Sequence, residues 1–205
     1  MTHRFYFIRH AESTGNLHPD IIGGRSNHLH LSETGIEQAQ ALAQNLLAKG
    51  ISFDGWYCSP AIRTVQTFER LATGLSLQEK AINDDDLQEL SQGDWEGKQR
   101  ALHHTPEMLQ YINQDSWNFK PPQGESQKEV GKRMFGFLEK LIANTPPGQY
   151  VIVGHGIAIR SLMRYIFESE ENYLALHLGN TSISIISHLA GEWKAEAVNI
   201  HAEAL

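Results

Sequence analysis

Residues 4–16 run Arg-Phe-Tyr-Phe-Ile-Arg-His-Ala-Glu-Ser-Thr-Gly-Asn, and residues 150–156 run Tyr-Val-Ile-Val-Gly-His-Gly. In each stretch an apolar run is followed by a histidine and then by small or polar residues, which is typical of a buried strand ending in a loop. Ligands of open α/β sheets bind just outside the carboxyl ends of the strands. If the two strands are neighbours, His10 and His155 converge on one crevice beside Arg9. Imidazole groups next to fixed positive charge suit an anionic substrate such as a phosphate.

The bulk composition is that of an ordinary globular domain. The chain has 205 residues, 40% of them hydrophobic and 20% charged, and this length can bury a substantial core in one domain. Its net charge of −7 at pH 7 argues against binding to nucleic acid or to an anionic membrane. Cys58 is the one cysteine. With no signal pattern and no apolar stretch of about 18 residues, we expect a cytoplasmic protein.

Strands and helices alternate along most of the chain, which is typical of an α/β sandwich. Apolar spacing predicts a helix over 33–49 and a short strand over 53–58, after which Ser59 and Pro60 are expected to cap and open the next helix. Further strands are expected at 81–83, 182–187 and 193–199, and further helices around 130–141 and 159–166. We expect one domain over 1–205, in which the less regular segment 84–125 caps the carboxyl edge of the sheet.

Arg9 and His10 carry the first chemical hypothesis. A neutral imidazole attacks phosphorus only if one ring nitrogen is free while the other holds its proton on a fixed acceptor. A histidine nucleophile then splits phosphoryl transfer into two easier steps, and Arg9 can present its planar fork of donors to the phosphoryl oxygens. The alternative is a surface ion pair or a helix cap, and the position at a strand end favours catalysis.

Two further positions can contribute to an anion site. Gly154 and Gly156 flank His155 and allow close approach of the backbone, and the helix that follows directs free amides toward an anion. Arg63 is expected in the first turn of the helix after Pro60, where its charge opposes the helix dipole unless an anion lies nearby. The alternatives are a turn with a structural histidine and a solvated arginine.

Hydrolysis of an alkyl phosphate also needs a general acid, because an alkoxide is a poor leaving group. A carboxyl group within 87–97 can supply it, although most loop carboxylates are solvated. The acidic run 84–86 makes a poor metal cage, because consecutive residues of an extended chain point to opposite faces. His103 and His104 lack the spacing of two ligands on one helix face, so a metal-dependent hydrolase is disfavoured.

Together these segments resemble the histidine phosphatase superfamily in its phosphoglycerate-mutase-like branch. The family pattern begins with an Arg-His-Gly-Glu-like stretch, which stands here as Arg9-His10-Ala11-Glu12. Further matches follow in the family's order at 13–16, 24–27, 31–35, 59–67, 89, 93–97, 124–126, 154–156 and 180–182. Each motif alone is weak, but the ordered set is highly specific.

The resemblance implies a three-layer α/β/α sandwich with a mostly parallel central sheet, and a metal-independent phosphomonoester hydrolase without a cofactor. His10 would become phosphohistidine, and Glu89 would protonate the leaving alkoxide and then deprotonate the attacking water. The expected ligands of the phosphoryl group and lining of the pocket are Arg9, Asn16, Arg63, His155, Ser13, Gly24 and Gly156.

Three departures from the family pattern bear on activity. Ala11 replaces the usual glycine, which the loop tolerates if its φ is negative, and Gly154 stands where many relatives carry serine. Leu90 and Ser91 follow Glu89, whereas bisphosphoglycerate-dependent mutases place Arg and Tyr there and carry a longer, more basic middle segment. A mutase must hold a bisphosphorylated intermediate by positive charge. With few basic residues in this segment (Lys98, Arg100 and Lys120), a phosphatase acting on a small phosphorylated metabolite is favoured.

Several alternatives stay open on the sequence alone. The chain could instead be a cofactor-dependent phosphoglycerate mutase, or a non-catalytic module that binds a phosphorylated ligand and has no need of an acid. An edge strand near 182–187 could pair across a homodimer or be covered by the terminal segment. The side chains that either line a specificity cap or pack its interior are Trp95, His103, His104, Trp117 and Phe119.

Overall fold

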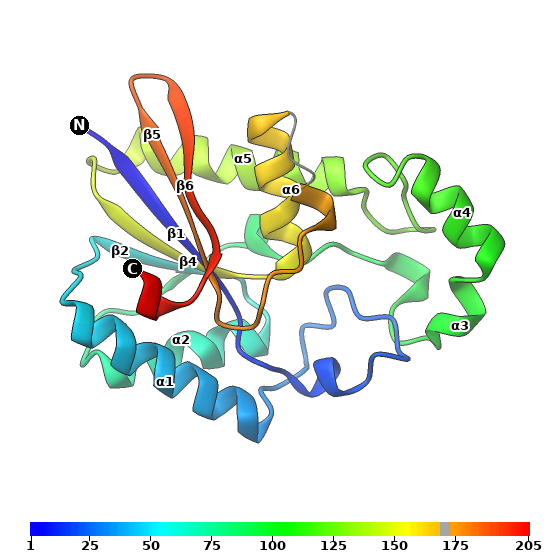
Figure 1. Ribbon diagram of the computed structural model, residues 1–205, viewed down its shortest axis with the longest axis horizontal. Coiled ribbons are helices and arrows are strands. Elements are labelled where there is room, and N and C mark those ends of the chain that lie inside the picture. Colours follow the sequence, from blue (N-terminus) through cyan, green and yellow to red (C-terminus); the bar gives the residue numbers. More distant parts are fainter. Residues whose placement is uncertain (169–172) are drawn as a thin grey trace.

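The computed structural model describes residues 1–168 and 173–205. Its strands are β1 (His3–Arg9), β2 (Gly55–Cys58), β3 (Ile82–Asn83), β4 (Gln149–Gly154), β5 (Ile183–Leu189) and β6 (Glu192–Ile200). They form one sheet in the order β3-β2-β4-β1-β5-β6 (Figure 1). Strands β3, β2, β4 and β1 pair in parallel, while β5 is antiparallel to both of its neighbours. The predicted mostly parallel sheet is confirmed.

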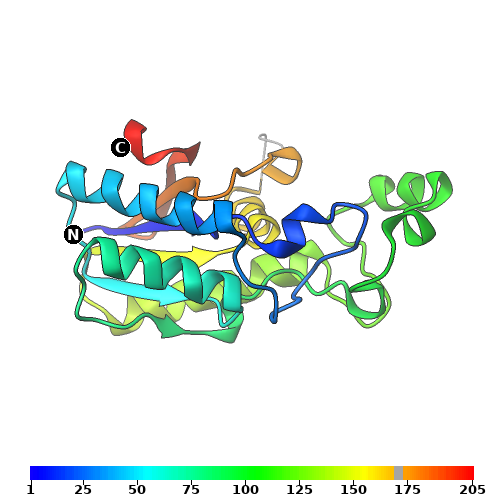
Figure 2. The same ribbon diagram turned by 90° about the horizontal axis from the view of Figure 1, so that it is seen from below.

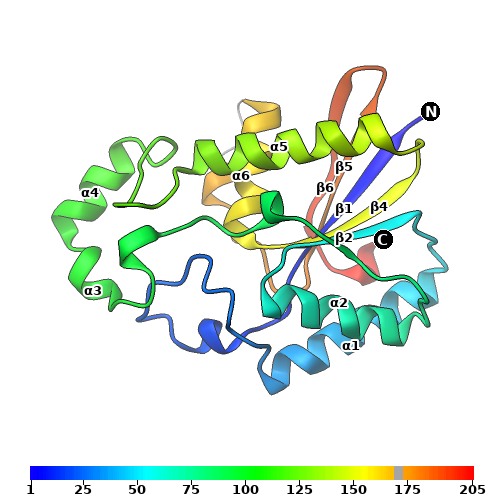
Figure 3. The ribbon, with the colours of Figure 1, turned by 180° about the vertical axis from the view of Figure 1, so that it is seen from behind.

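Helices cover both faces of the sheet, so the predicted three-layer α/β/α sandwich is also confirmed. Helices α1 (Glu33–Lys49) and α2 (Ile62–Gly74) lie on one face, and α5 (Gln127–Asn144) and α6 (Gly156–Phe167) on the other (Figure 2). Figure 3 shows the sheet from the side of α5. Because side chains of a strand alternate between faces, Tyr6 and Ile8 of β1 join the α1–α2 core while Phe5 and Phe7 join the α5–α6 core.

The segment 84–125 forms a lobe beside the end of the sheet at which β1 and β4 terminate (Figure 1). It contains α3 (Arg100–His103), α4 (Pro106–Gln114) and short 3₁₀ turns joined by loops. Thr105 caps α4 by accepting a hydrogen bond from the backbone N–H of Met108, an arrangement that stabilises a helix start. The lobe lies at the carboxyl edge of the sheet, and its role as a cap over the active site stays a prediction.

The predicted start of the second helix is wrong. Helix α2 begins at Ile62, and its N-cap is Ala61 in an extended conformation with φ −65° and ψ 139°. Ser59 does not cap the helix, because its hydroxyl lies 2.8 Å from a ring nitrogen of His155. Arg63 does lie in the first turn, as predicted.

Strand β5 is not an edge strand. It lies between β1 and β6, so the terminal segment covers it, which was one of the two alternatives. The edges of the described sheet are β3 and β6. No helix among the described residues is long and apolar enough to cross a membrane.

Candidate active site

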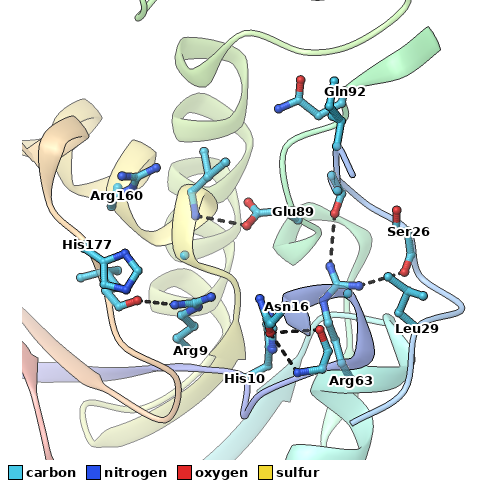
Figure 4. Close-up of a pocket in the computed structure, with 18 of the residues that line it drawn as sticks. Arg9, His10, Asn16, Ser26, Leu29, Arg63, Glu89, Gln92, Arg160 and His177 are labelled. Carbon is cyan, nitrogen blue, oxygen red and sulfur yellow. Dashed lines mark hydrogen bonds between the residues drawn. The ribbon is translucent and has the colours of Figure 1, made fainter. Parts of the chain in front are cut away.

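Parallel pairing of β1 with β4 brings the two histidines together. Arg9 lies opposite Gly154 in the register of the pair, and the backbone N–H of His10 donates to the carbonyl of Gly154 over 2.9 Å. A histidine follows each strand, and the ring centroids of His10 and His155 are 5.3 Å apart. The predicted convergence is confirmed, and a cavity of about 450 Å³ opens beside it (Figure 4).

His10 lines this cavity with one ring nitrogen committed to the backbone. Its Nδ1 lies 2.7 Å from the carbonyl oxygen of Ala11. A carbonyl only accepts hydrogen bonds, so Nδ1 carries the proton and Nε2 keeps its lone pair. Burial, and then the guanidinium of Arg63, lower the pKa of His10 well below its usual value. The imidazole is therefore held neutral. The neighbouring Ala11, which replaces the glycine usual in the family, has a negative φ, so the loop tolerates this replacement.

His155 is completely buried and holds Arg63 in place. Its Nδ1 lies 3.1 Å from Nη2 of Arg63, and because a guanidinium only donates, the proton of His155 is on Nε2. That Nε2–H donates to Oγ of Ser59 over 2.8 Å. Burial and Arg63 lower the pKa of His155 well below its usual value. His155 is not among the described residues that line the cavity, so its direct contact with a phosphoryl group stays a prediction.

Arg63 is 4% exposed and is fixed by the loop 24–26. Its Nη1 donates to the carbonyls of Arg25 at 2.9 Å and Ser26 at 3.0 Å. The carboxylate of Glu96 holds the same loop by accepting from the backbone N–H groups of Arg25 and Ser26. Gly24 has φ +108°, and a Cβ there would lie 2.6 Å from that carboxylate, so a side chain does not fit. Arg63, Gly24 and Ser26 line the cavity.

Arg9 runs along the start of α6. A Cβ at Gly156 would lie 3.4 Å from Nε of Arg9, whereas a Cβ at Gly154 would have nothing within 4 Å. Close approach of either glycine to an anion stays a prediction. The Nη1 of Arg9 donates to the carbonyl of Leu178. Burial lowers the pKa of Arg9, and Glu89 opposes this shift while Arg160 adds to it. The guanidinium groups of Arg9 and Arg160 and the carboxylate of Glu89 therefore lie close enough at this side of the cavity to influence one another's charge.

Glu89 faces the cavity from the side opposite His10 (Figure 4). Its Oε1 accepts from the backbone N–H groups of Leu90 and Ala158, both at 2.9 Å. Its Oε2 accepts from the N–H of Ile157 at 3.1 Å. Two of these donors belong to the first turn of α6, where free amides stabilise negative charge. Oε2 accepts one amide against two for Oε1, so Oε2 is the atom better able to exchange a proton.

The polar loop after β1 supplies Ser13 and Asn16 to the cavity. The Oδ1 of Asn16 accepts from the backbone N–H of Ser13 at 2.9 Å and from its hydroxyl at 3.1 Å. Because Oδ1 takes these bonds, Nδ2 of Asn16 is the atom that can donate to an anion.

The structure also brings to the cavity residues that the sequence analysis missed. Arg160 lies four residues after Gly156 on α6, hence on the same face of the helix, and its Nη1 donates to the carbonyl of Leu176 at 2.8 Å. That spacing could have indicated it. Arg100 belongs to the lobe and donates to the carbonyls of Pro19 and Ile21. The sequence around Arg100 gives no indication of these distant partners. Gln92 and His177 are further polar residues of the lining that the sequence analysis did not name.

The aromatic and histidine side chains of the lobe mainly contact one another. The ring of Trp95 lies 5.3 Å from that of His103 and 5.8 Å from those of His104 and Phe119. Trp117 lies under the guanidinium of Arg164, 5.8 Å away. None of them is among the described residues that line the catalytic cavity. They pack the lobe, although some line a second, smaller cavity.

The acidic run at 84–86 has structural partners. Asp84 accepts from the backbone N–H of Asp86 at 2.8 Å, and Asp86 pairs with Lys140 at 3.0 Å. Among the described residues, no three His, Cys, Asp or Glu side chains gather in a way that could hold a metal ion.

Comparison with known proteins agrees with this geometry. The 2,3-bisphosphoglycerate-dependent phosphoglycerate mutase of Mesorhizobium japonicum is 30% identical over 92% of this chain and 93% of its own length. The structure of mycobacterial glucosyl-3-phosphoglycerate phosphatase in complex with VO3 has a TM-score of 0.83 and 25% identity, covering 96% of this chain and 98% of that one. Phosphoglycerate mutase from Bacillus anthracis shares the fold, with a TM-score of 0.82 and 22% identity over 97% of this chain and 93% of its own.

The family itself follows from the sequence model that matches nearly the whole chain. The model of the histidine phosphatase superfamily (branch 1) matches residues 5–201, which includes both histidine motifs, Arg63 and Glu89. The chain therefore belongs to the histidine phosphatase superfamily, branch 1.

Proposed function

We propose that the chain is a metal-independent phosphomonoester hydrolase that works through a phosphohistidine on His10. The observation that carries this proposal is the 2.7 Å distance between Nδ1 of His10 and the carbonyl oxygen of Ala11. Because a carbonyl only accepts, we infer that the proton is on Nδ1 and that Nε2 keeps its lone pair. Arg9 and Arg63 line the same cavity. Their guanidinium groups can neutralise the phosphoryl oxygens and so let the lone pair approach phosphorus.

In the first step, Nε2 of His10 attacks phosphorus. The N–P bond forms as the bond between phosphorus and the leaving oxygen breaks. Glu89, which faces His10 across the cavity (Figure 4), delivers a proton from Oε2 to the departing alkoxide. The alcohol product leaves, and His10 holds the phosphoryl group between Arg9 and Arg63.

In the second step, a water molecule takes the place of the alcohol. The Glu89 carboxylate accepts a proton from the water as its oxygen attacks phosphorus and the N–P bond breaks. Inorganic phosphate leaves, and His10 returns to the neutral form that its burial favours. One water is consumed, and Glu89 regains the proton that it lost in the first step.

The placement of cations in the cavity favours hydrolysis of the phosphate ester over mutase activity. Arg100 is the one cation of 84–125 among the described residues that line the cavity; Lys98 and Lys120 do not line it. Its Nε and Nη2 donate to the carbonyls of Pro19 and Ile21, so it ties the lobe to the loop after β1. Arg9 and Arg63 serve the phosphoryl group on His10, so among the described residues of 84–125 only Arg100 is left for the second phosphoryl group that a mutase must also hold.

A phosphoglycerate mutase is the second candidate, and two observations favour it. Arg160 adds a cation to the cavity, so the lining is more basic than the sequence analysis expected. The Mesorhizobium mutase matches this chain over 93% of its own length. A longer middle segment therefore does not separate this chain from that mutase, and the expectation built on segment length was wrong for this relative.

The substrate we propose is a small phosphate ester. A volume of about 450 Å³ falls within the range of roughly 300–1,000 Å³ that is usual for small-molecule sites. A module that only binds a phosphorylated ligand is the less economical proposal, because it would need neither a free Nε2 on His10 nor a carboxyl group opposite it.

Trapping the phosphoenzyme tests the proposal. The protein is mixed with a ³²P-labelled phosphomonoester and quenched in alkali, in which phosphohistidine is stable. We expect label on the wild type, no label and no turnover in His10→Ala, and normal label in the control His201→Ala, which changes an exposed histidine near the carboxyl terminus. Turnover by His10→Ala, or release of phosphate by the wild type without a labelled histidine, would overturn it.

A further inference from the structure

A second cavity lies between the lobe and the starts of α5 and α6, next to the catalytic one. Its volume is about 110 Å³. We call it the annex, and its apolar walls are Leu90, Trp95, Ile112, Phe119, Pro121 and Ile157.

Glu125 is the acidic residue that lines the annex, and its carboxylate is paired with two arginines. The carboxylate of Glu125 accepts from Nε of Arg133 at 3.0 Å and from the backbone N–H of Ser91 at 3.0 Å, and Arg25 lies 3.3 Å from it. Gln92, His104, Ser116 and Gln127 also line the annex, but six of its eleven lining residues are apolar. This lining favours a mainly apolar group over a charged one.

The annex and the catalytic cavity share part of their lining. Gln92 and Ile157 line both, and Figure 4 shows Gln92 beyond Glu89 as seen from His10. The backbone N–H of Ile157 donates to Oε2 of Glu89, and Leu90 follows Glu89 in the chain. Walls of the annex thus adjoin the carboxyl group that is placed to protonate the leaving oxygen.

The in-line geometry of phosphoryl transfer also places the leaving group near the annex. In a phosphoryl transfer the leaving oxygen lies roughly in line with the attacking atom and on its far side. With Nε2 of His10 attacking and Glu89 protonating, the carbon attached to the leaving oxygen extends past Glu89, toward Gln92 and Ile157.

We propose that the annex receives the apolar part of the leaving group, so that the preferred substrates are phosphomonoesters of alcohols that carry a compact apolar group. This inference rests on the proposed function. A dry cavity of about 150 Å³ is known to hold benzene, so the smaller annex suits a group of about four carbons, such as a branched alkyl chain or the edge of a ring.

Phosphate release from a homologous series of alkyl phosphates tests the annex. We expect kcat/KM of the wild type to rise about fourfold with each added methylene, which is the usual gain for burying one, and to level off once the annex is full. Ile112→Trp, which fills the annex from α4, should bring the ratio of the butyl to the ethyl ester close to one. Leu109→Trp makes a similar change at a side chain that is 40% exposed on the same helix, and it should keep the wild-type ratio.

The enlarging variant Ile112→Ala gives an independent result if the filled variant does not fold. It should shift the preferred chain toward longer esters. A flat series in the wild type, or an unchanged butyl-to-ethyl ratio in Ile112→Trp or an unchanged optimum in Ile112→Ala, would overturn the annex while leaving hydrolysis standing. If no ester of the series releases phosphate, the proposed function fails and the annex proposal fails with it.

Discussion

Replacing Glu89 by glutamine removes the proton that the leaving oxygen needs while changing the shape of the site very little. Two of the three amide bonds to Glu89 reach Oε1, and the carbonyl oxygen of glutamine can accept both. Only the N–H of Ile157, 3.1 Å from Oε2, would face an amide nitrogen. An unpaired donor of this kind costs about 1–3 kcal/mol, which is small beside the roughly 5–15 kcal/mol of a typical domain. We therefore expect the variant to fold.

The loss of activity should depend on the leaving group. General acid catalysis contributes about 10²–10⁴-fold, equivalent to about 3–5 kcal/mol of barrier. We expect kcat/KM of Glu89→Gln to fall by that factor for an alkyl phosphate. For an activated aryl phosphate, which needs little protonation, the fall should be less than about tenfold.

The assay is release of inorganic phosphate from matched alkyl and aryl esters, with Glu69→Gln as control because Glu69 is exposed on α2. The control should behave as the wild type on both esters. Equal losses of Glu89→Gln on the two esters would remove Glu89 from the role of general acid.

Three further predictions concern stability. Ser59→Ala leaves the buried Nε2–H of His155 without its acceptor and should lower the free energy of unfolding by about 1–3 kcal/mol; an unchanged urea midpoint would contradict the bond. His10 and His155 both have lowered pKa values in the folded state, so below about pH 6.5 the unfolded chain binds more protons than the folded one. The free energy of unfolding should thus be unaffected by these histidines above about pH 6.5. Below that pH it should fall by about 1.4 kcal/mol per pH unit for each histidine as the pH drops toward the folded pKa. Equal unfolding free energies at about pH 7.5 and about pH 5.5 would refute this. Gly35→Ala would place a Cβ 1.9 Å from the carbonyl oxygen of Glu12 and should destabilise the chain by about 3 kcal/mol. In the control Gly136→Ala, the new Cβ has nothing within 4 Å, and the variant should be more stable by about 1 kcal/mol. Melting temperatures that shift in the same direction in both variants would be inconsistent with this packing.

The sequence predicted the part of the site that depends on strand topology. His10 and His155 each follow an apolar run, and parallel strands deliver such residues to the same edge of the sheet. Alternation of strands and helices predicted the sandwich for the same reason, because its signals are local and repeated along the chain.

Contacts between distant loops left no local signal. Glu89 was named through the family resemblance, and what orients it is a pair of amides from α6, almost seventy residues along the chain. Arg100 reaches the cavity through carbonyls near residue 20. Ser59 was assigned to a helix cap because serine before proline is typical of one, yet the hydroxyl bonds to His155 instead. The competing partner lies 96 residues away in the chain, beyond the reach of a pattern of neighbours.

The central claim is that water, and not a second hydroxyl of the substrate, accepts the phosphoryl group from His10. The most direct test measures inorganic phosphate released in the presence of EDTA from a panel that includes 3-phosphoglycerate, while formation of 2-phosphoglycerate is followed in the same samples. We predict release of phosphate that EDTA does not suppress, with little isomerisation. Conversion of 3-phosphoglycerate to 2-phosphoglycerate without release of phosphate would contradict the account and identify the chain as a mutase.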